Sequence, residues 1–134
     1  MGVRRQPEAT PTPSGKPRYQ ILGHPDFHEY LKKLRNSNRS EDKELVRLIY
    51  AAIDVLEERA TAGESVPRDR SPRTKKYEGI PNLYRYRLDR TYRMTYFIAK
   101  VGNQFVVNVI EAMNHTQYNQ IFGYDGIDWP TGLV

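Results

Sequence analysis

Apolar residues in the first part of the chain recur at helical spacing. Phe27 is followed at three, four and seven residues by Tyr30, Leu31 and Leu34. This spacing is typical of a helix with one apolar face. Proline is well suited to the first turn of a helix, and Pro25 stands just before the pattern begins. The pattern therefore predicts a helix from about Pro25 to Arg35.

A second, longer apolar stripe follows a polar link of four residues, Asn36 to Arg39. Its members recur on one helical face: Leu45, Leu48, Ile49, Ala52, Ile53 and Leu56. Ser40 is a suitable N-cap, and we expect the helix to end near Gly63. A link this short favours an antiparallel helical hairpin.

The second half of the chain alternates with a period of two, which is typical of strands. Alternation from Leu83 to Leu88 places Leu83, Arg85 and Arg87 on one face and tyrosines on the other. After the link 89–91, a second alternating run follows. It places Tyr92, Met94, Tyr96 and Ile98 on one face of the strand, and Arg93, Thr95 and Phe97 on the other face. These two runs predict a β-hairpin with one charged face.

Two further strands complete the predicted sheet. Gly102 and Asn103 form a turn into the run QFVVNVIEAM, and Pro17 to Leu22 is a short strand candidate. The segment 64–82 carries prolines and charges and is predicted to be a long loop. Helical potential returns at Thr116 to Ile121.

These elements predict an α+β fold in the order β-α-α-β-β-β, with a two-helix hairpin packed on a small antiparallel sheet and a C-terminal helical segment. Residues 1–16 combine prolines with small polar residues and are predicted to be a disordered tail. Residues 17–134 are predicted to form a single domain, which fits a chain of 134 residues.

Positive charge is concentrated in the middle of the chain. The formal net charge is +5, whereas residues 68–100 contain ten Lys or Arg and three Asp or Glu, a local excess of +7. This excess favours a polyanion such as nucleic acid, or an acidic protein, as the partner. The alternative is that the charge serves solubility alone.

The chain has no cysteine, which excludes disulfides, thiolate metal sites and cysteine nucleophiles. No apolar run approaches 18 residues and no signal-peptide core is present, so a cytoplasmic protein that does not enter a membrane is expected. His24 and His28 stand four residues apart without an H-E-x-x-H pattern, so neither a metal site nor a cofactor is expected.

From about Tyr19 to Tyr124 the chain resembles the RelE/ParE toxin superfamily, and in particular RelE-like mRNA endoribonucleases. The resemblance rests on the helical hairpin followed by KKYEGIPNLYRYRL, YRMTY, VVNVIEA and H-T-Q-Y, in this order. It implies a RelE-like microbial RNase-type fold whose concave sheet face binds RNA. It also implies a type II toxin with a separate antitoxin protein as partner and mRNA as substrate, either free or on the ribosome.

The resemblance also implies catalytic residues. Arg93, in YRMTY, matches the strand arginine that stabilises the phosphate, and Arg85 matches a basic position that can share this role. His115 and Tyr118 match the C-terminal catalytic groups, with His115 as general acid or base and Tyr118 orienting a phosphate, stacking on a base or donating a proton. For Arg93, the alternative is a structural pairing.

Four further residues are implied to bind RNA: Lys75, Lys76, Arg87 and Arg90. For Arg87 and Lys76, the alternative is an ordinary solvated surface. Two other functions stay open at this point: a ParE-like inhibitor of DNA gyrase, and a protein that keeps the fold and binds a partner without catalysis.

Overall fold

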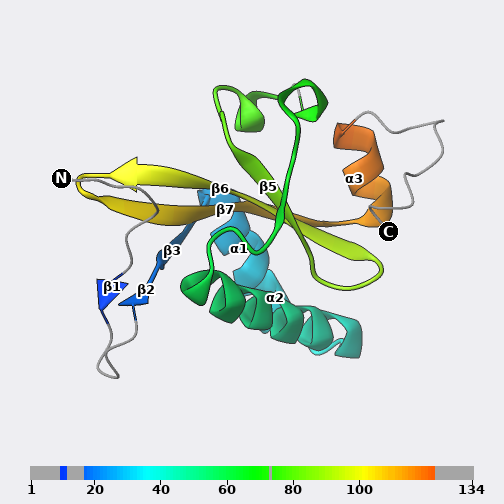
Figure 1. The fold of residues 1–134 in the computed structure, drawn as a ribbon. Helices are drawn as coiled ribbons and strands as arrows, with labels where there is room; N and C mark the ends of the chain where they lie inside the picture. The colour runs from blue at the N-terminus through cyan, green and yellow to red at the C-terminus, as the bar shows by residue number, and fades with distance from the viewer. Residues whose placement is uncertain (1–9, 12–16, 73, 123–134) are drawn as a thin grey trace.

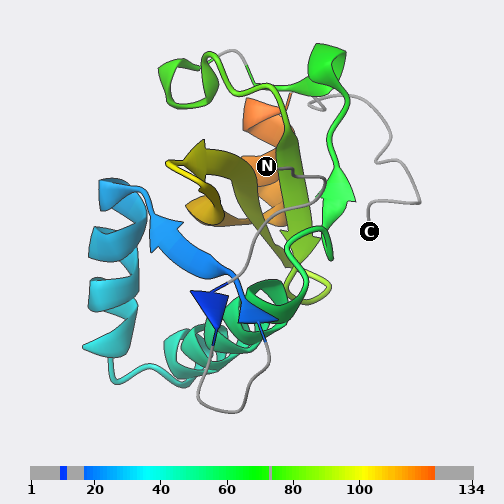
Figure 2. The ribbon, with the colours of Figure 1, turned by 60° about the vertical axis from the view of Figure 1, so that its left-hand side comes forward.

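The structure is a computed structural model that describes residues 10–11, 17–72 and 74–122. The main sheet has five strands in the order β3-β7-β6-β5-β4. Their bounds are Gln20–Gly23, Gln104–Asn114, Tyr92–Val101, Leu83–Arg87 and Glu64–Ser65, in that order. Helices α1 (Pro25–Arg35) and α2 (Ser40–Glu58) cover one face. Helix α3 (His115–Ile121) lies on the other face, together with the segment that joins β4 to β5 (Figures 1 and 2).

The first helix has the predicted bounds because both of its ends are stabilised. His24 caps it, with Nδ1 accepting a hydrogen bond from the Asp26 backbone N–H at 3.0 Å, and Pro25 stands in the first turn. Basic residues in the last turn complement the negative end of the helix dipole. The predicted C-terminal helix and the turn at Gly102 are also confirmed.

The second helix differs from the prediction at both ends. Ser40 is its first residue and Arg39 is the cap, and the helix ends at Glu58 instead of near Gly63. The helix ends early because backbone groups of the residues that follow form hydrogen bonds with the Tyr96 side chain. Its hydroxyl donates to the Ala60 carbonyl at 2.8 Å and accepts from the Gly63 N–H at 2.9 Å.

The predicted first strand is split in two. Pro17–Arg18 (β2) pairs with Thr10–Pro11 (β1), whereas Gln20–Gly23 (β3) joins the main sheet. Tyr19 separates them, since its N–H donates to the Glu57 carbonyl at the end of α2 at 2.7 Å. The rest of the predicted tail lies outside the described residues, as do residues 123–134, so the predicted tail and domain limits stay predictions.

The sheet is mixed, and the prediction of a purely antiparallel sheet was wrong. β3 pairs in parallel with β7, from Gln20↔Val106 to Gly23↔Val109. β4, which follows the two helices, is antiparallel to β5, and β5 runs in the same direction as β3. β7 also runs that way after two hairpin turns, and parallel pairing needs such a crossover.

The predicted long loop also contains regular structure. It begins with β4 and includes the 3-10 turns η1 (Arg68–Arg70) and η2 (Lys75–Tyr77). Among the described residues, no helix is long and apolar enough to cross a membrane.

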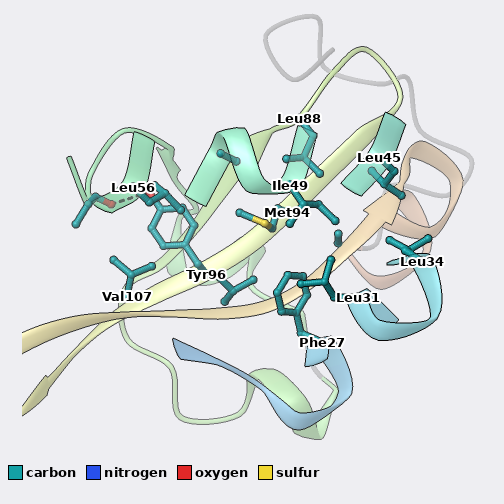
Figure 3. Packing of buried hydrophobic residues seen from close by; sticks show 14 residues of the cluster. Phe27, Leu31, Leu34, Leu45, Ile49, Leu56, Leu88, Met94, Tyr96 and Val107 are labelled. Atoms are coloured by element: carbon teal, nitrogen blue, oxygen red, sulfur yellow. Dashed lines mark hydrogen bonds between the residues drawn. The ribbon is translucent and has the colours of Figure 1, made fainter. Parts of the chain in front are cut away.

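Two apolar clusters hold the layers together, one on each face of the sheet. Between the sheet and the helical hairpin lies the larger cluster, which includes Phe27, Leu31, Leu34, Leu45, Ile49, Leu56, Met94, Tyr96 and Val107 (Figure 3). Under α3 lies the smaller one, formed by Val66, Tyr77, Leu83, Ile110, Met113, Tyr118 and Phe122. The charged face of the predicted hairpin is therefore half apolar, and its arginines lie beside a packed cluster.

Replacing Tyr96 with phenylalanine tests the link between α2 and the sheet. The Tyr96 side chain is fully buried, so loss of its hydroxyl leaves a carbonyl and an N–H without this partner. We expect the free energy of unfolding, measured by urea denaturation, to fall by about 1–3 kcal/mol. The control is Tyr84→Phe, because the half-buried Tyr84 ring stacks on Tyr96. This change should lower the free energy of unfolding by less. Equal losses would contradict this role for the hydroxyl.

Candidate phosphate-binding site

The pairing of β5 with β6 gathers the predicted arginines on one face. Arg87 lies directly opposite Arg93, and Arg85 lies opposite Thr95. Since side chains directly opposite each other point to the same face, three guanidinium groups share this side of the sheet. The predicted charged face of the hairpin is confirmed.

These arginines line a cavity of about 300 Å³, together with Glu64 and Gly63. Three arginines and one glutamate give the lining a net formal charge of +2. An anionic group such as a phosphate suits a cavity of this charge.

Arg93 forms the floor of the cavity. Only 2% of the residue is exposed, and its Nη1 donates to the backbone carbonyls of Asp89 at 2.8 Å and Tyr92 at 3.1 Å. Burial lowers the pKa of the Arg93 guanidinium, and the nearby positive charge of Arg87 lowers it further. A bound anion would offset both effects.

The turn between β5 and β6 fixes the orientation of this arginine. The Asp89 carboxylate accepts from the backbone N–H groups of Thr91 at 2.8 Å and Tyr92 at 2.7 Å, which closes the turn. The Asp89 carbonyl then accepts from Arg93, and from Arg87 Nε at 3.4 Å. The turn therefore holds both arginines by one backbone oxygen.

Arg85 is held from two sides. Its Nε donates to Glu64 Oε1 at 3.0 Å, and its Nη1 donates to the Tyr118 hydroxyl oxygen at 3.1 Å. Burial works against a charged guanidinium, but Tyr118 and Glu64 raise the pKa of Arg85 overall. Tyr118 is itself completely buried and stacks on Phe122 with ring centroids 4.1 Å apart. The C-terminal helix α3 thus contributes to the cavity indirectly, because its Tyr118 holds Arg85 in place.

His115 is the first residue of α3 and follows directly on β7. Because Asn114 pairs with Tyr92, the first residue of β6, His115 lies at the end of the sheet where β6 begins. Asn114 caps the helix by a reciprocal pair of hydrogen bonds with Gln117, which fixes the direction in which α3 leaves the strand. His115 is half-buried there.

Of the four predicted RNA-binding residues, Arg87 alone is among the residues that line the arginine cavity. Lys76 Nζ is held between Asp26 Oδ2 at 3.3 Å and Glu111 Oε1 at 3.5 Å, and it lines a different cavity. Lys75 and Arg90 are exposed, Lys75 in η2 and Arg90 in the β5–β6 turn. Arg87 is exposed as well but lines the arginine cavity.

Glu64 is the site residue that the sequence analysis missed. The predicted loop begins at Glu64, but the structure pairs this residue with Arg85 across β4 and β5. Gly63 makes the close approach possible, since a Cβ there would lie 2.6 Å from the Arg85 carbonyl oxygen. No sequence pattern marks Glu64, because its partner lies 21 residues away on another strand.

No convergent group of three or more His, Cys, Asp or Glu side chains is found in the part of the chain that the structure describes.

The chain was compared with protein families, curated proteins and solved structures. No protein-family model matches the chain, and no curated protein matches it significantly in sequence. Among solved structures, the chain is similar to one described as a YoeB/ParE toxin from Agrobacterium tumefaciens, with 16% identity and a TM-score of 0.48. The likeness covers 72% of this chain and 98% of that chain.

Inorganic phosphate should stabilise the folded protein by binding in the arginine cavity. At a phosphate concentration of ten times Kd, the expected gain is about 1.4 kcal/mol, measured as a rise in Tm. In Arg93→Ala the rise should shrink, because the floor of the cavity loses its charge. Lys33→Ala, at an exposed position of α1, controls for general salt effects and should respond like the wild type. An equal response in Arg93→Ala would exclude phosphate binding at this cavity.

Proposed function

We propose that this chain is the toxin of a type II toxin–antitoxin pair and acts as a metal-independent mRNA endoribonuclease. The observation that carries the proposal is the arginine cavity, in which three guanidinium groups on rigid strands face one space with a net charge of +2. RNA cleavage of this kind needs stabilisation of charge on a phosphoryl group at a fixed place.

The arginines provide that stabilisation. The ribose 2′-oxygen attacks the adjacent phosphorus, the bond from phosphorus to the 5′-oxygen breaks, and a 2′,3′-cyclic phosphate forms. Negative charge grows on the phosphoryl oxygens during attack. The guanidinium of Arg93 at the cavity floor and that of Arg87 at its exposed side donate hydrogen bonds to these oxygens. Their support by the Asp89 carbonyl holds them in place before RNA arrives.

Two proton transfers accompany the attack. We assign Glu64, whose carboxylate lines the cavity, to accept the proton of the 2′-hydroxyl. His115 is not among the residues that line the cavity, and we assign it to donate a proton to the departing 5′-oxygen because the resemblance places a catalytic group at this position. Tyr118 acts as a positioning residue because it is fully buried and reaches the cavity by holding Arg85.

The positive charge of the arginine cavity also supports the proposal that the partner is an antitoxin protein. An acidic segment of a second protein would find the same cationic cavity that suits a phosphate. Such a segment would compete directly with RNA for the cavity and would thereby inhibit cleavage. The two other functions, gyrase inhibition and partner binding without catalysis, are separated from nuclease activity by the first experiment below.

Induced expression in a bacterial host tests the function directly. We expect the wild type to produce new mRNA 5′ ends within coding regions. Arg93→Ala should lower their yield by about 10²–10³-fold, because one hydrogen-bond donor to the phosphoryl oxygens is lost. Lys33→Ala should behave like the wild type. DNA supercoiling is followed in the same cells. Intact messages with disturbed supercoiling would indicate gyrase inhibition, and neither effect would indicate a binding protein.

His115→Gln separates proton transfer from binding. The cleavage rate of labelled mRNA, with and without translating ribosomes, should fall about 10²–10⁴-fold, because glutamine cannot donate a proton in the same way. Affinity for an RNA blocked by 2′-O-methyl groups should stay unchanged. His28→Gln, at an exposed position of α1, is the matched control. Full activity of His115→Gln would remove His115 from the mechanism.

A further inference from the structure

The arginine cavity and helix α3 lie on the same face of the sheet. Arg85, Arg87 and Arg93 face away from the helical hairpin, and α3 packs on that side over the smaller apolar cluster (Figures 1 and 2). The Tyr118 hydroxyl of α3 accepts from Arg85 Nη1 at 3.1 Å. The chain that leaves α3 therefore starts on the side of the sheet where the cavity lies.

The end of α3 is a fixed starting point for that chain. Phe122 is buried, and its ring stacks on Tyr118 with centroids 4.1 Å apart and meets Tyr77 edge-on at 6.1 Å. Its backbone N–H donates to the Tyr118 carbonyl at 3.0 Å. Two successive contacts, from Phe122 to Tyr118 and from Tyr118 to Arg85, thus connect the end of the helix with a wall of the cavity.

The sequence that follows α3 is acidic. Residues 123–134, which lie outside the described part of the chain, read GYDGIDWPTGLV and contain Asp125 and Asp128 but no Lys or Arg. Their formal charge is therefore −2, whereas three arginines and one glutamate give the lining of the arginine cavity a charge of +2. Opposite charges of equal size favour contact between the segment and the cavity.

Both aspartates are within reach of the cavity. An extended chain spans about 3.3–3.6 Å per residue, so Asp125 lies up to about 10 Å and Asp128 up to about 20 Å from Phe122. Gly123 stands directly after the C-cap, where glycine commonly turns the chain out of a helix. A return along α3 brings the aspartates towards the cavity, since Tyr118 lies one turn before Phe122.

We propose that residues 123–134 fold back along α3 and occupy the arginine cavity, where the carboxylates of Asp125 and Asp128 accept hydrogen bonds from the cavity arginines. Hydrogen bonds between guanidinium and carboxylate groups are strong because both partners are charged. Trp129 directly follows Asp128, and its ring adds a cation–π contact with the exposed guanidinium of Arg87. A short tether keeps such a segment at an effective concentration on the order of millimolar.

The segment is then an intramolecular competitor of every anion that the cavity binds. A segment that occupies the cavity for about nine-tenths of the time lowers the apparent affinity for phosphate about tenfold. As a device that regulates cleavage, this contact rests on the proposed nuclease function. The contact itself requires only the charge and the place of the cavity.

Fluorescence of Trp129 reports on the segment directly, because the chain has one tryptophan. Added inorganic phosphate should shift the emission of the wild type to longer wavelength and increase its quenching by acrylamide, because displacement exposes the indole to water. Sodium chloride at the same ionic strength controls for screening and should act more weakly. In Arg93→Ala the emission should resemble that of the displaced segment before phosphate is added. An emission that phosphate leaves unchanged in the wild type would overturn the proposal.

Phosphate affinity provides the second test. The double variant Asp125→Asn with Asp128→Asn removes both carboxylates and nearly keeps their size. Inorganic phosphate should bind this variant about tenfold more tightly than the wild type, measured from the backbone amide NMR signals of Arg87 and Arg93.

The matched control changes the net charge equally on the other face of the molecule. Asp54→Asn with Glu58→Gln alters two exposed acids of α2 and should keep the wild-type affinity. Equal gains in the two double variants would overturn the proposal, because overall charge would then explain them. A gain that depends on protein concentration would assign the segment to a second copy of the chain, and the proposal would be wrong.

Cleavage of labelled mRNA separates this inference from the proposed nuclease. If both hold, the variant of Asp125 and Asp128 cleaves faster than the wild type at limiting RNA. Tighter phosphate binding by the variant without cleavage by either chain would refute the nuclease alone. Cleavage by both chains with equal phosphate affinity would refute the intramolecular contact alone.

Discussion

The register between β5 and β6 decides what each face of the central sheet carries. Tyr84 lies opposite Tyr96, and Arg87 lies opposite Arg93, so the aromatic residues face the helical hairpin and the arginines face away. A slip of one residue would exchange the two faces. It would bury guanidinium groups under α2 without partners, at a cost that the apolar cluster could not offset. The core and the cationic cavity therefore depend on the same pairing.

Burial of Arg93 shows how the fold holds charge beside a packed cluster. A nearly fully buried guanidinium is unfavourable unless its donors are occupied, and backbone carbonyls at the β5–β6 turn accept from it. The turn is closed by the Asp89 carboxylate, so a local motif orients a residue of the site. Arg85 is fixed differently, by Glu64 and Tyr118, which come from two distant parts of the chain. Both arginines are preorganised, the first by local structure and the second by tertiary contacts.

Two cavities of opposite charge are each lined in part by β6. Residues 62–64 and β5 complete the first cavity, whereas α1, Lys76, β7 and α3 complete the second. The cationic cavity is lined by three arginines and one glutamate, and the anionic cavity beside the β7 edge by two carboxylates and one lysine. The early end of β3 and the capped start of α3 leave the second cavity open, so the extent of strand pairing shapes it directly.

Short-range patterns in the sequence determined most elements. Apolar spacing and Pro25 were enough to predict the bounds of α1, and alternation was enough to predict which residues share a face of β5 and β6. Both signals depend only on neighbours along the chain. The arginines of the site followed from the same alternation. Other features needed the tertiary structure: the parallel pairing of β3 with β7, the early end of α2 at the Tyr96 hydroxyl, the ion pair of Glu64 with Arg85, and the place of Lys76 in a separate cavity. Each depends on a contact between segments far apart in the sequence, and local periodicity carries no information about which distant segments meet.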